Sequence, residues 1–196
     1  MLQRKDCMCR FVKAFTRITL FPFYQIDIKG RERLPREDAF ILLPKHQCWQ
    51  DIPIIALATP RPLYYIAKYE LFENRFTGWF LESLGGIPLN REQPLKSRDS
   101  IRAMIEFLKN GEGIVIFPEG TYYENRMGPG KTGMLRLIIS RMTFPLIPVG
   151  VKYEKTRRRT AVQVSFGNPI YPDRTVPPSI ILHRVMEEIG VLSGLG

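Results

Sequence analysis

The feature that most constrains the fold of this chain is the alternation of short apolar runs with amphipathic helical patterns along most of its length. Several of the apolar runs are rich in Ile, Val, Phe or Tyr and end at Gly or Pro, which predicts β-strands. The predicted strands are 24–28, 39–43, 63–67, 86–89, 114–117, 147–153 and 161–166. The predicted helices are 52–58, 70–84, 97–110, 132–142 and 178–189. This alternation is typical of an α/β fold, so we expect a single domain with a mixed, mostly parallel central sheet flanked by helices.

The N-terminal segment, residues 1–23, stands apart from this alternation. Four apolar residues share one face of a predicted helix there, and basic residues lie among them. The apolar residues are Phe11, Val12, Phe15 and Ile18, and the basic ones are Arg4, Lys5, Arg10, Lys13 and Arg17. A basic amphipathic helix of this kind suits a membrane interface, although the same stripe would also serve a helix packed on its own sheet. We expect residues 1–23 to form a membrane-contacting segment in front of a domain at 24–196.

The charge of the chain indicates an anionic partner. Its 196 residues include 29 Lys and Arg against 19 Asp and Glu, a formal net charge of +10. Nucleic acid, an anionic membrane surface and a phosphorylated substrate are all compatible with this excess. A second basic cluster, at Lys152, Lys155 and 157–159, falls at the expected hairpin tip between the last two strands. The chain lacks a basic motif interleaved with aromatic residues and a zinc framework, so we expect no nucleic-acid partner.

The cysteines and the apolar runs bear on the compartment. Cys7, Cys9 and Cys48 are too few for a disulfide framework, which favours a reducing, cytoplasmic environment. No apolar run approaches the roughly 18–20 residues that a membrane-spanning helix needs. A protein on the cytoplasmic face of a membrane, bound peripherally, is therefore the expectation.

A histidine and an aspartate follow one of the predicted strands. His46 comes just after the apolar run 39–43, and Asp51 stands five residues later, before the start of a helix. On one continuous helix these side chains would diverge by about 140°, but on a turn that enters a helix they can meet. Asp51 would then orient the imidazole and leave its other nitrogen as a general base. A structural histidine with satisfied hydrogen bonds is the alternative.

Two further clusters follow predicted strands. Glu119 and Gly120 come directly after the run 114–117, where a carboxylate could cap a helix, bind a hydroxyl or position a basic residue. Arg91 follows the strand 86–89, and its planar guanidinium suits a phosphate. Because open α/β sheets bind ligands at the carboxyl ends of their strands, we expect the functional site there.

Together, these residues spell four motifs. His46-Gln-Cys-Trp-Gln-Asp51 resembles the H-x4-D block of the glycerophospholipid acyltransferases, the lysophosphatidic acid acyltransferase family. Segments 86–91, 117–121 and 146–149 (Gly-Ile-Pro-Leu-Asn-Arg, Phe-Pro-Glu-Gly-Thr and Leu-Ile-Pro-Val) resemble that family's second, third and fourth blocks, in the family order. The resemblance covers roughly residues 25–155. It implies that 24–196 is an acyltransferase domain.

The resemblance also implies roles for individual residues. His46, oriented by Asp51, would take the proton of the acceptor hydroxyl. Substrate binding is expected from Arg91, Glu119, Gly120, Thr121, Arg126 and Lys131. Arg126 enters because Tyr122 stands where the family often carries an arginine. Neither a metal nor a cofactor is expected, because an acyl thioester serves as co-substrate.

The function that follows is transfer of a fatty acyl group from acyl-CoA or acyl-carrier protein to 1-acyl-glycerol 3-phosphate, a lysophosphatidic acid, forming phosphatidic acid in phospholipid biosynthesis. Another lyso-lipid or amphiphilic alcohol as the acceptor, or a non-enzymatic lipid-binding module on the same fold, are the alternatives. Cys48, two residues from His46, raises the further alternative of an acyl-cysteine intermediate.

Overall fold

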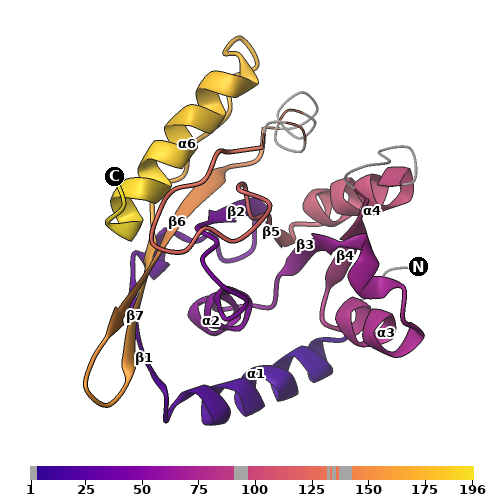
Figure 1. Cartoon of the computed structure of the whole chain (residues 1–196). Helices are drawn as coiled ribbons and strands as arrows, with labels where there is room; N and C mark the ends of the chain where they lie inside the picture. The colour runs from indigo at the N-terminus through magenta and orange to yellow at the C-terminus, as the bar shows by residue number, and fades with distance from the viewer. Residues whose placement is uncertain (1–3, 91–96, 132, 134–135, 137–142) are drawn as a thin grey trace.

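The computed structural model describes residues 4–90, 97–131, 133, 136 and 143–196, and its centre is a seven-stranded sheet (Figure 1). The strands are β1 (Tyr24–Lys29), β2 (Phe40–Pro44), β3 (Tyr64–Lys68), β4 (Gly86–Leu89), β5 (Gly113–Val115), β6 (Leu146–Lys155) and β7 (Thr160–Phe166). Their order across the sheet is β1-β7-β6-β2-β5-β3-β4. Neighbouring strands run parallel except β6 and β7, which form an antiparallel hairpin. The predicted fold class, mixed and mostly parallel, is confirmed.

Helices cover both faces of this sheet. They are α1 (Asp6–Leu20), α2 (Asp51–Ala58), α3 (Arg75–Ser83), α4 (Arg98–Lys109) and α6 (Pro178–Ser193), with short 3-10 helices η1 (Arg31–Arg33) and η2 (Tyr69–Phe72). The apolar clusters place α4 and α6 on one face and α2 on the other, and α1 lies beside α2 (Figure 1). Most of the helix predicted at 132–142 lies outside the described residues.

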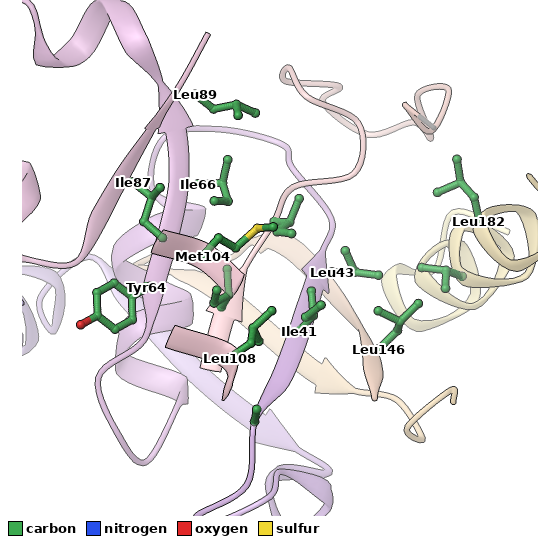
Figure 2. Close-up of a cluster of buried hydrophobic side chains, with 14 of the residues drawn as sticks. Ile41, Leu43, Tyr64, Ile66, Ile87, Leu89, Met104, Leu108, Leu146 and Leu182 are labelled. Atoms are coloured by element: carbon green, nitrogen blue, oxygen red, sulfur yellow. The ribbon is translucent and has the colours of Figure 1, made fainter. Parts of the chain in front are cut away.

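Strand β2 is the central element, and all five of its residues are buried. Its side chains alternate between the two apolar clusters. Ile41 and Leu43 pack in the cluster that contains Met104 of α4 and Leu182 of α6, as Figure 2 shows. Phe40 and Leu42 belong to the cluster on the opposite face, together with residues of α2. A strand buried on both faces gives a rigid origin to the residues that follow it.

The prediction of one continuous helix at 70–84 was wrong, because the structure has two separate helices there, η2 and α3. Asn74 stands between them, and its side-chain oxygen accepts hydrogen bonds from the N–H groups of Phe76 (2.9 Å) and Thr77 (3.3 Å). Asparagine is a favoured N-cap because it satisfies these otherwise unpaired donors. A new helix therefore begins at Arg75.

Helix α1 is tied to the domain at its beginning. The guanidinium of Arg4 forms two hydrogen bonds to the carboxylate of Glu112 (3.0 and 3.1 Å) and lies over the ring of Tyr64. Farther along, Lys13 Nζ donates to the carbonyl oxygen of Thr59 at 2.5 Å. These contacts hold the polar side of α1 against the protein.

The apolar stripe of α1 points away from the protein. Phe11, Phe15 and Ile18 are 71%, 60% and 73% exposed, and no residue within Asp6–Leu20 is buried. Three of the four residues of the predicted stripe are thus exposed, and the fourth, Val12, is half-buried. None of the helices in the described part of the chain has the length and apolar character needed to cross a membrane.

Candidate active site

His46 and Asp51 meet in the turn between β2 and α2. His46 stands two residues after the end of β2, and Asp51 is the first residue of α2. Their side chains are 3.0 Å apart, between His46 Nδ1 and Asp51 Oδ2. The carboxylate side chain is fully buried, whereas that of the histidine is 10% exposed. The turn thus brings together two side chains that a continuous helix would separate.

The chemistry of the pair assigns the imidazole proton. A carboxylate only accepts hydrogen bonds, so the hydrogen between the two groups belongs to His46 Nδ1. In the neutral ring Nε2 then carries the lone pair. The arrangement suits a general base whose orientation is fixed by its neighbour.

Two backbone N–H groups and a phenol also donate to the Asp51 carboxylate. The backbone N–H groups of Gln47 and Cys48 donate to Oδ2 at 2.6 and 2.9 Å. The phenol of Tyr153, on β6, donates to Oδ1 at 2.6 Å. Because a buried carboxylate needs donors in place of water, these bonds satisfy its two oxygens.

Tyr153 was missed by the sequence analysis. It lies 102 residues beyond Asp51, at the end of a predicted strand, and no local pattern connects the two. Burial and the negative charge of Asp51 raise the pKa of Tyr153 far above its ordinary value. The raised pKa favours the protonated phenol, which is the form that can donate to Asp51.

The His46 ring lies between two aromatic side chains. It stacks on Phe117 with ring centroids 3.8 Å apart, and the edge contact with Tyr122 measures 4.4 Å between centroids. Tyr122 is 52% exposed and so forms part of the surface beside the ring. Burial raises the pKa of the Tyr122 phenol, and the electrostatic effects of Asp51 and Cys48 act in the same direction.

Glu119 was expected to bind substrate, but its carboxylate is fully buried and bonded to the protein. Lys45 Nζ donates to both of its oxygens, at 2.9 and 2.8 Å, and the Lys45 side chain is also fully buried. The N–H groups of His46 (3.0 Å) and Gly128 (2.6 Å) donate to the same carboxylate. Glu119 therefore stabilises the main chain around His46, and its side chain is not accessible to a ligand. Lys45 was not singled out from the sequence, where only its position between a buried strand and His46 marks it.

The loop after β5 brings most of the other predicted binding residues to this end of the sheet. The N–H of Tyr123 donates to the carbonyl oxygen of His46 (2.9 Å), and the N–H of Lys131 donates to that of Pro118 (2.8 Å). Thr121, Arg126 and Lys131 are exposed on this loop.

Gly120 allows the loop to turn. Its φ of +70° lies in the left-handed region that glycine adopts without strain. Arg91 lies outside the described residues, two positions along the sequence from the end of β4.

The cysteines do not form a recognisable catalytic or metal site. Cys48 Sγ lies 3.7 Å from Asp51 Oδ1, and burial raises the pKa of its thiol, which disfavours the reactive thiolate. Cys7 and Cys9 remain free thiols. Within the described part of the chain, no group of three or more His, Cys, Asp or Glu side chains is placed to hold a metal ion.

The chain is similar to known proteins over most of its length. A family model described as "Acyltransferase" matches residues 25–152. A chloroplastic 1-acyl-sn-glycerol-3-phosphate acyltransferase of Brassica napus is 32% identical over 139 residues, which are 70% of this chain and 40% of that protein. A 1-acyl-sn-glycerol-3-phosphate acyltransferase of Streptococcus pneumoniae is 32% identical over 147 residues, which are 71% of this chain and 53% of that protein. The chain thus spans about half the length of these relatives.

A solved structure shares the fold. The 1-acyl-sn-glycerophosphate acyltransferase PlsC of Thermotoga maritima superposes with a TM-score of 0.75 at 24% identity. The match covers 95% of this chain and 78% of that one. The strand order and the helices on both faces described above therefore belong to a known architecture.

Proposed function

Because the chain belongs to the acyltransferase family, we propose that it transfers a fatty acyl group from an acyl thioester to the free hydroxyl of 1-acyl-glycerol 3-phosphate, forming phosphatidic acid. The observation that carries this proposal is the 3.0 Å contact between His46 Nδ1 and Asp51 Oδ2 at the carboxyl end of β2. The names of the relatives support the choice of acceptor. The donor is acyl-CoA or acyl-carrier protein, and no resident cofactor takes part.

In the proposed reaction the acceptor itself is the nucleophile. Nε2 of His46 removes the proton of the acceptor hydroxyl as that oxygen attacks the thioester carbonyl carbon. A new C–O bond forms, the tetrahedral intermediate collapses, and the C–S bond breaks to release the thiolate. The proton held by His46 then passes to the thiolate or to solvent, which restores the neutral base. Asp51 holds the ring throughout and stabilises the imidazolium.

The acceptor phosphate is proposed to bind at the loop after β5. Thr121, Arg126 and Lys131 are exposed there, and the loop is bonded to the main chain of His46. Two cations and a hydroxyl offer charge-assisted hydrogen bonds to a phosphate monoester. Gly120 gives the backbone its turn at this point, and Arg91 stays a predicted fourth contact.

An assay of thiol release tests the reaction. The chain is incubated with an acyl thioester and 1-acyl-glycerol 3-phosphate, and with other lyso-lipids in parallel, while the freed thiol is measured. Loss of the base in His46→Ala is expected to lower the rate about 10²- to 10⁴-fold.

The second histidine provides the control. His183 is exposed on α6, where its Nε2 lies 3.3 Å from Glu187, and His183→Ala is expected to retain the wild-type rate. Equal release from wild type and His46→Ala would refute the mechanism and favour a lipid-binding module.

We also propose that the protein works peripherally on the cytoplasmic face of an anionic membrane. The exposed apolar stripe of α1 supports this, because such a face suits the boundary between headgroups and acyl chains. The basic β6–β7 hairpin tip lies at the end of the same helix, with the guanidinium of Arg159 4.8 Å from the centre of the Phe21 ring (Figure 1). Apolar and cationic groups therefore lie side by side.

A further inference from the structure

The two oxygens of Asp51 are held unequally. Oδ2 faces His46 Nδ1 and the N–H groups of Gln47 and Cys48. Oδ1 accepts from the Tyr153 hydroxyl at 2.6 Å and, among the described residues, otherwise has only the weak thiol contact of Cys48 at 3.7 Å. The strong hydrogen bond on the Oδ1 side is therefore that of Tyr153.

The phenol reaches Asp51 from a rigid part of the sheet. Tyr153 pairs with Val162 in the antiparallel β6–β7 ladder, while the beginning of β6 pairs with β2. Two residues before Tyr153, the carbonyl oxygen of Val151 accepts a hydrogen bond from Gln47 Nε2 at 2.7 Å. Strand β6 is thus bonded to the turn that carries His46 and Asp51, so the hydroxyl has a fixed place relative to the carboxylate.

Loss of this hydroxyl would change how hydrogen-bond donors are distributed between the two oxygens of the Asp51 carboxylate. A buried oxygen left without a strong donor is unfavourable, and rotation about the Cβ–Cγ bond would let Oδ1 share the N–H groups that now serve Oδ2. The same rotation would turn Oδ2 away from the plane of the imidazole. The hydrogen bond from the ring would then lengthen and lose its alignment.

We propose that Tyr153 is a positioning residue, whose hydroxyl fixes the Asp51 carboxylate in the orientation that holds the Nδ1–H form of His46. Its effect on turnover rests on the proposed function, whereas its effect on the imidazole does not. The ring of Tyr153 also packs against the apolar cluster beneath α2, so the substitution that tests the hydroxyl must keep the ring.

Tyr153→Phe meets this requirement, and Tyr171→Phe is its control. Tyr171 is 71% exposed and forms no part of the site, so its variant reports on the loss of a phenol elsewhere. Tyr153→Phe is expected to lower kcat about tenfold, while KM for each substrate stays within about twofold. Tyr171→Phe is expected to match the wild type.

A double-mutant cycle asks whether Tyr153 acts through Asp51. In an Asp51→Asn background, Tyr153→Phe is expected to cause little further loss, because the group that it positions is already gone. Equal losses from Tyr153→Phe in the wild-type and Asp51→Asn backgrounds, or no loss in the wild-type background, would overturn the proposal.

Nitrogen NMR of the imidazole provides a readout that needs no turnover. The chain has two histidines, so in a His183→Gln variant all imidazole signals come from His46. We expect the signature of a protonated Nδ1 and an unprotonated Nε2, and a shift toward a mixture of the two tautomers on Tyr153→Phe. An unchanged spectrum would overturn the proposal. A changed spectrum in a protein without acyl-transfer activity would retain it and refute the proposed function instead.

Discussion

The main chain of His46 is held on both sides by the buried pair Lys45–Glu119. Glu119 accepts the His46 N–H at 3.0 Å, and Lys45 Nζ lies 3.2 Å from the His46 carbonyl oxygen. Lys45 Nζ also donates to the carbonyl oxygen of Tyr123 at 2.8 Å. A single ion pair therefore joins the end of β2, the histidine and the loop after β5. Its role is to fix geometry, since burying an ion pair gives little net stability compared with apolar groups of similar size.

Glu119→Gln tests this interpretation, because it removes the charge and keeps the side-chain volume. The buried Lys45 ammonium would lose its counter-charge, and we expect the free energy of unfolding to fall by about 3–5 kcal/mol. Urea unfolding measures this change.

The exposed pair Lys152–Glu154 is the matched control for Glu119→Gln, with 2.6 Å between Nζ and Oε1. Glu154→Gln is expected to leave the urea midpoint unchanged, because exposed pairs are screened by water. Similar midpoints for wild type and Glu119→Gln would contradict the structural role assigned to Glu119.

Residues close in sequence were easier to predict than residues that meet through the sheet. His46 and Asp51 were predicted as a pair because they are only five residues apart. Their contact depends on the single turn between them. Glu119 was assigned to substrate through the family resemblance, and its buried partner, Lys45, could not be identified because it follows a different strand. Tyr153 carried no signal at all, since its contact depends on which strand lies next to β2.

At the scale of the elements, the apolar runs predicted all seven strands of the described sheet, with no strand end displaced by more than two residues. The division between η2 and α3 was missed, because the helical period of the apolar residues continues across Asn74. A capping side chain decides that boundary, and it acts through two backbone N–H groups rather than through hydrophobicity.

Helix α1 yields a prediction about membrane binding. Replacing Phe11 and Phe15 by Ser removes two exposed aromatic rings from the stripe and leaves the Arg4 and Lys13 contacts in place. We expect binding to vesicles that contain anionic lipid to weaken at least about tenfold, because apolar area no longer enters the interface. Co-sedimentation measures the bound fraction.

The paired control for α1 is Ile180→Ser with Val191→Ser on α6, where both side chains are more than half exposed. This control is expected to bind vesicles like the wild type. Equal weakening in the two double variants would show that the stripe of α1 is not the docking face.

For the molecule as a whole, the excess charge of +10 predicts that vesicle binding depends on salt. Replacing Arg157, Arg158 and Arg159 by Gln removes three of the five cations of the hairpin cluster, and these side chains are exposed. We expect this variant to bind anionic vesicles more weakly and with a smaller salt dependence, and to bind neutral vesicles as the wild type does. Co-sedimentation over a range of salt concentrations checks this.

Arg98 and Arg102 on α4 provide the control for the hairpin, because they are also exposed and α4 lies away from the hairpin tip (Figure 1). Replacing them by Gln is expected to have a smaller effect on binding. A hairpin variant with wild-type affinity for anionic vesicles would contradict the prediction.

The order of strands was beyond sequence reasoning. The alternation of elements predicts a sheet of mostly parallel strands, but nothing in it specifies that β1 pairs with β7 or that β2 lies between β5 and β6. Such neighbours are chosen by the packing of helices on both faces, which depends on the whole chain at once.

The pairing of β1 with β7 also bears on how the chain is made. Tyr24 meets Thr160 in this pair, so β1 has no partner from the described sheet until more than a hundred further residues have been synthesised. Long-range pairing of this kind slows folding, and an unpaired strand edge next to an exposed apolar helix favours aggregation. During translation, we therefore expect shielding of the N-terminal part, by a chaperone or a lipid surface, to reduce aggregation until β7 has been synthesised.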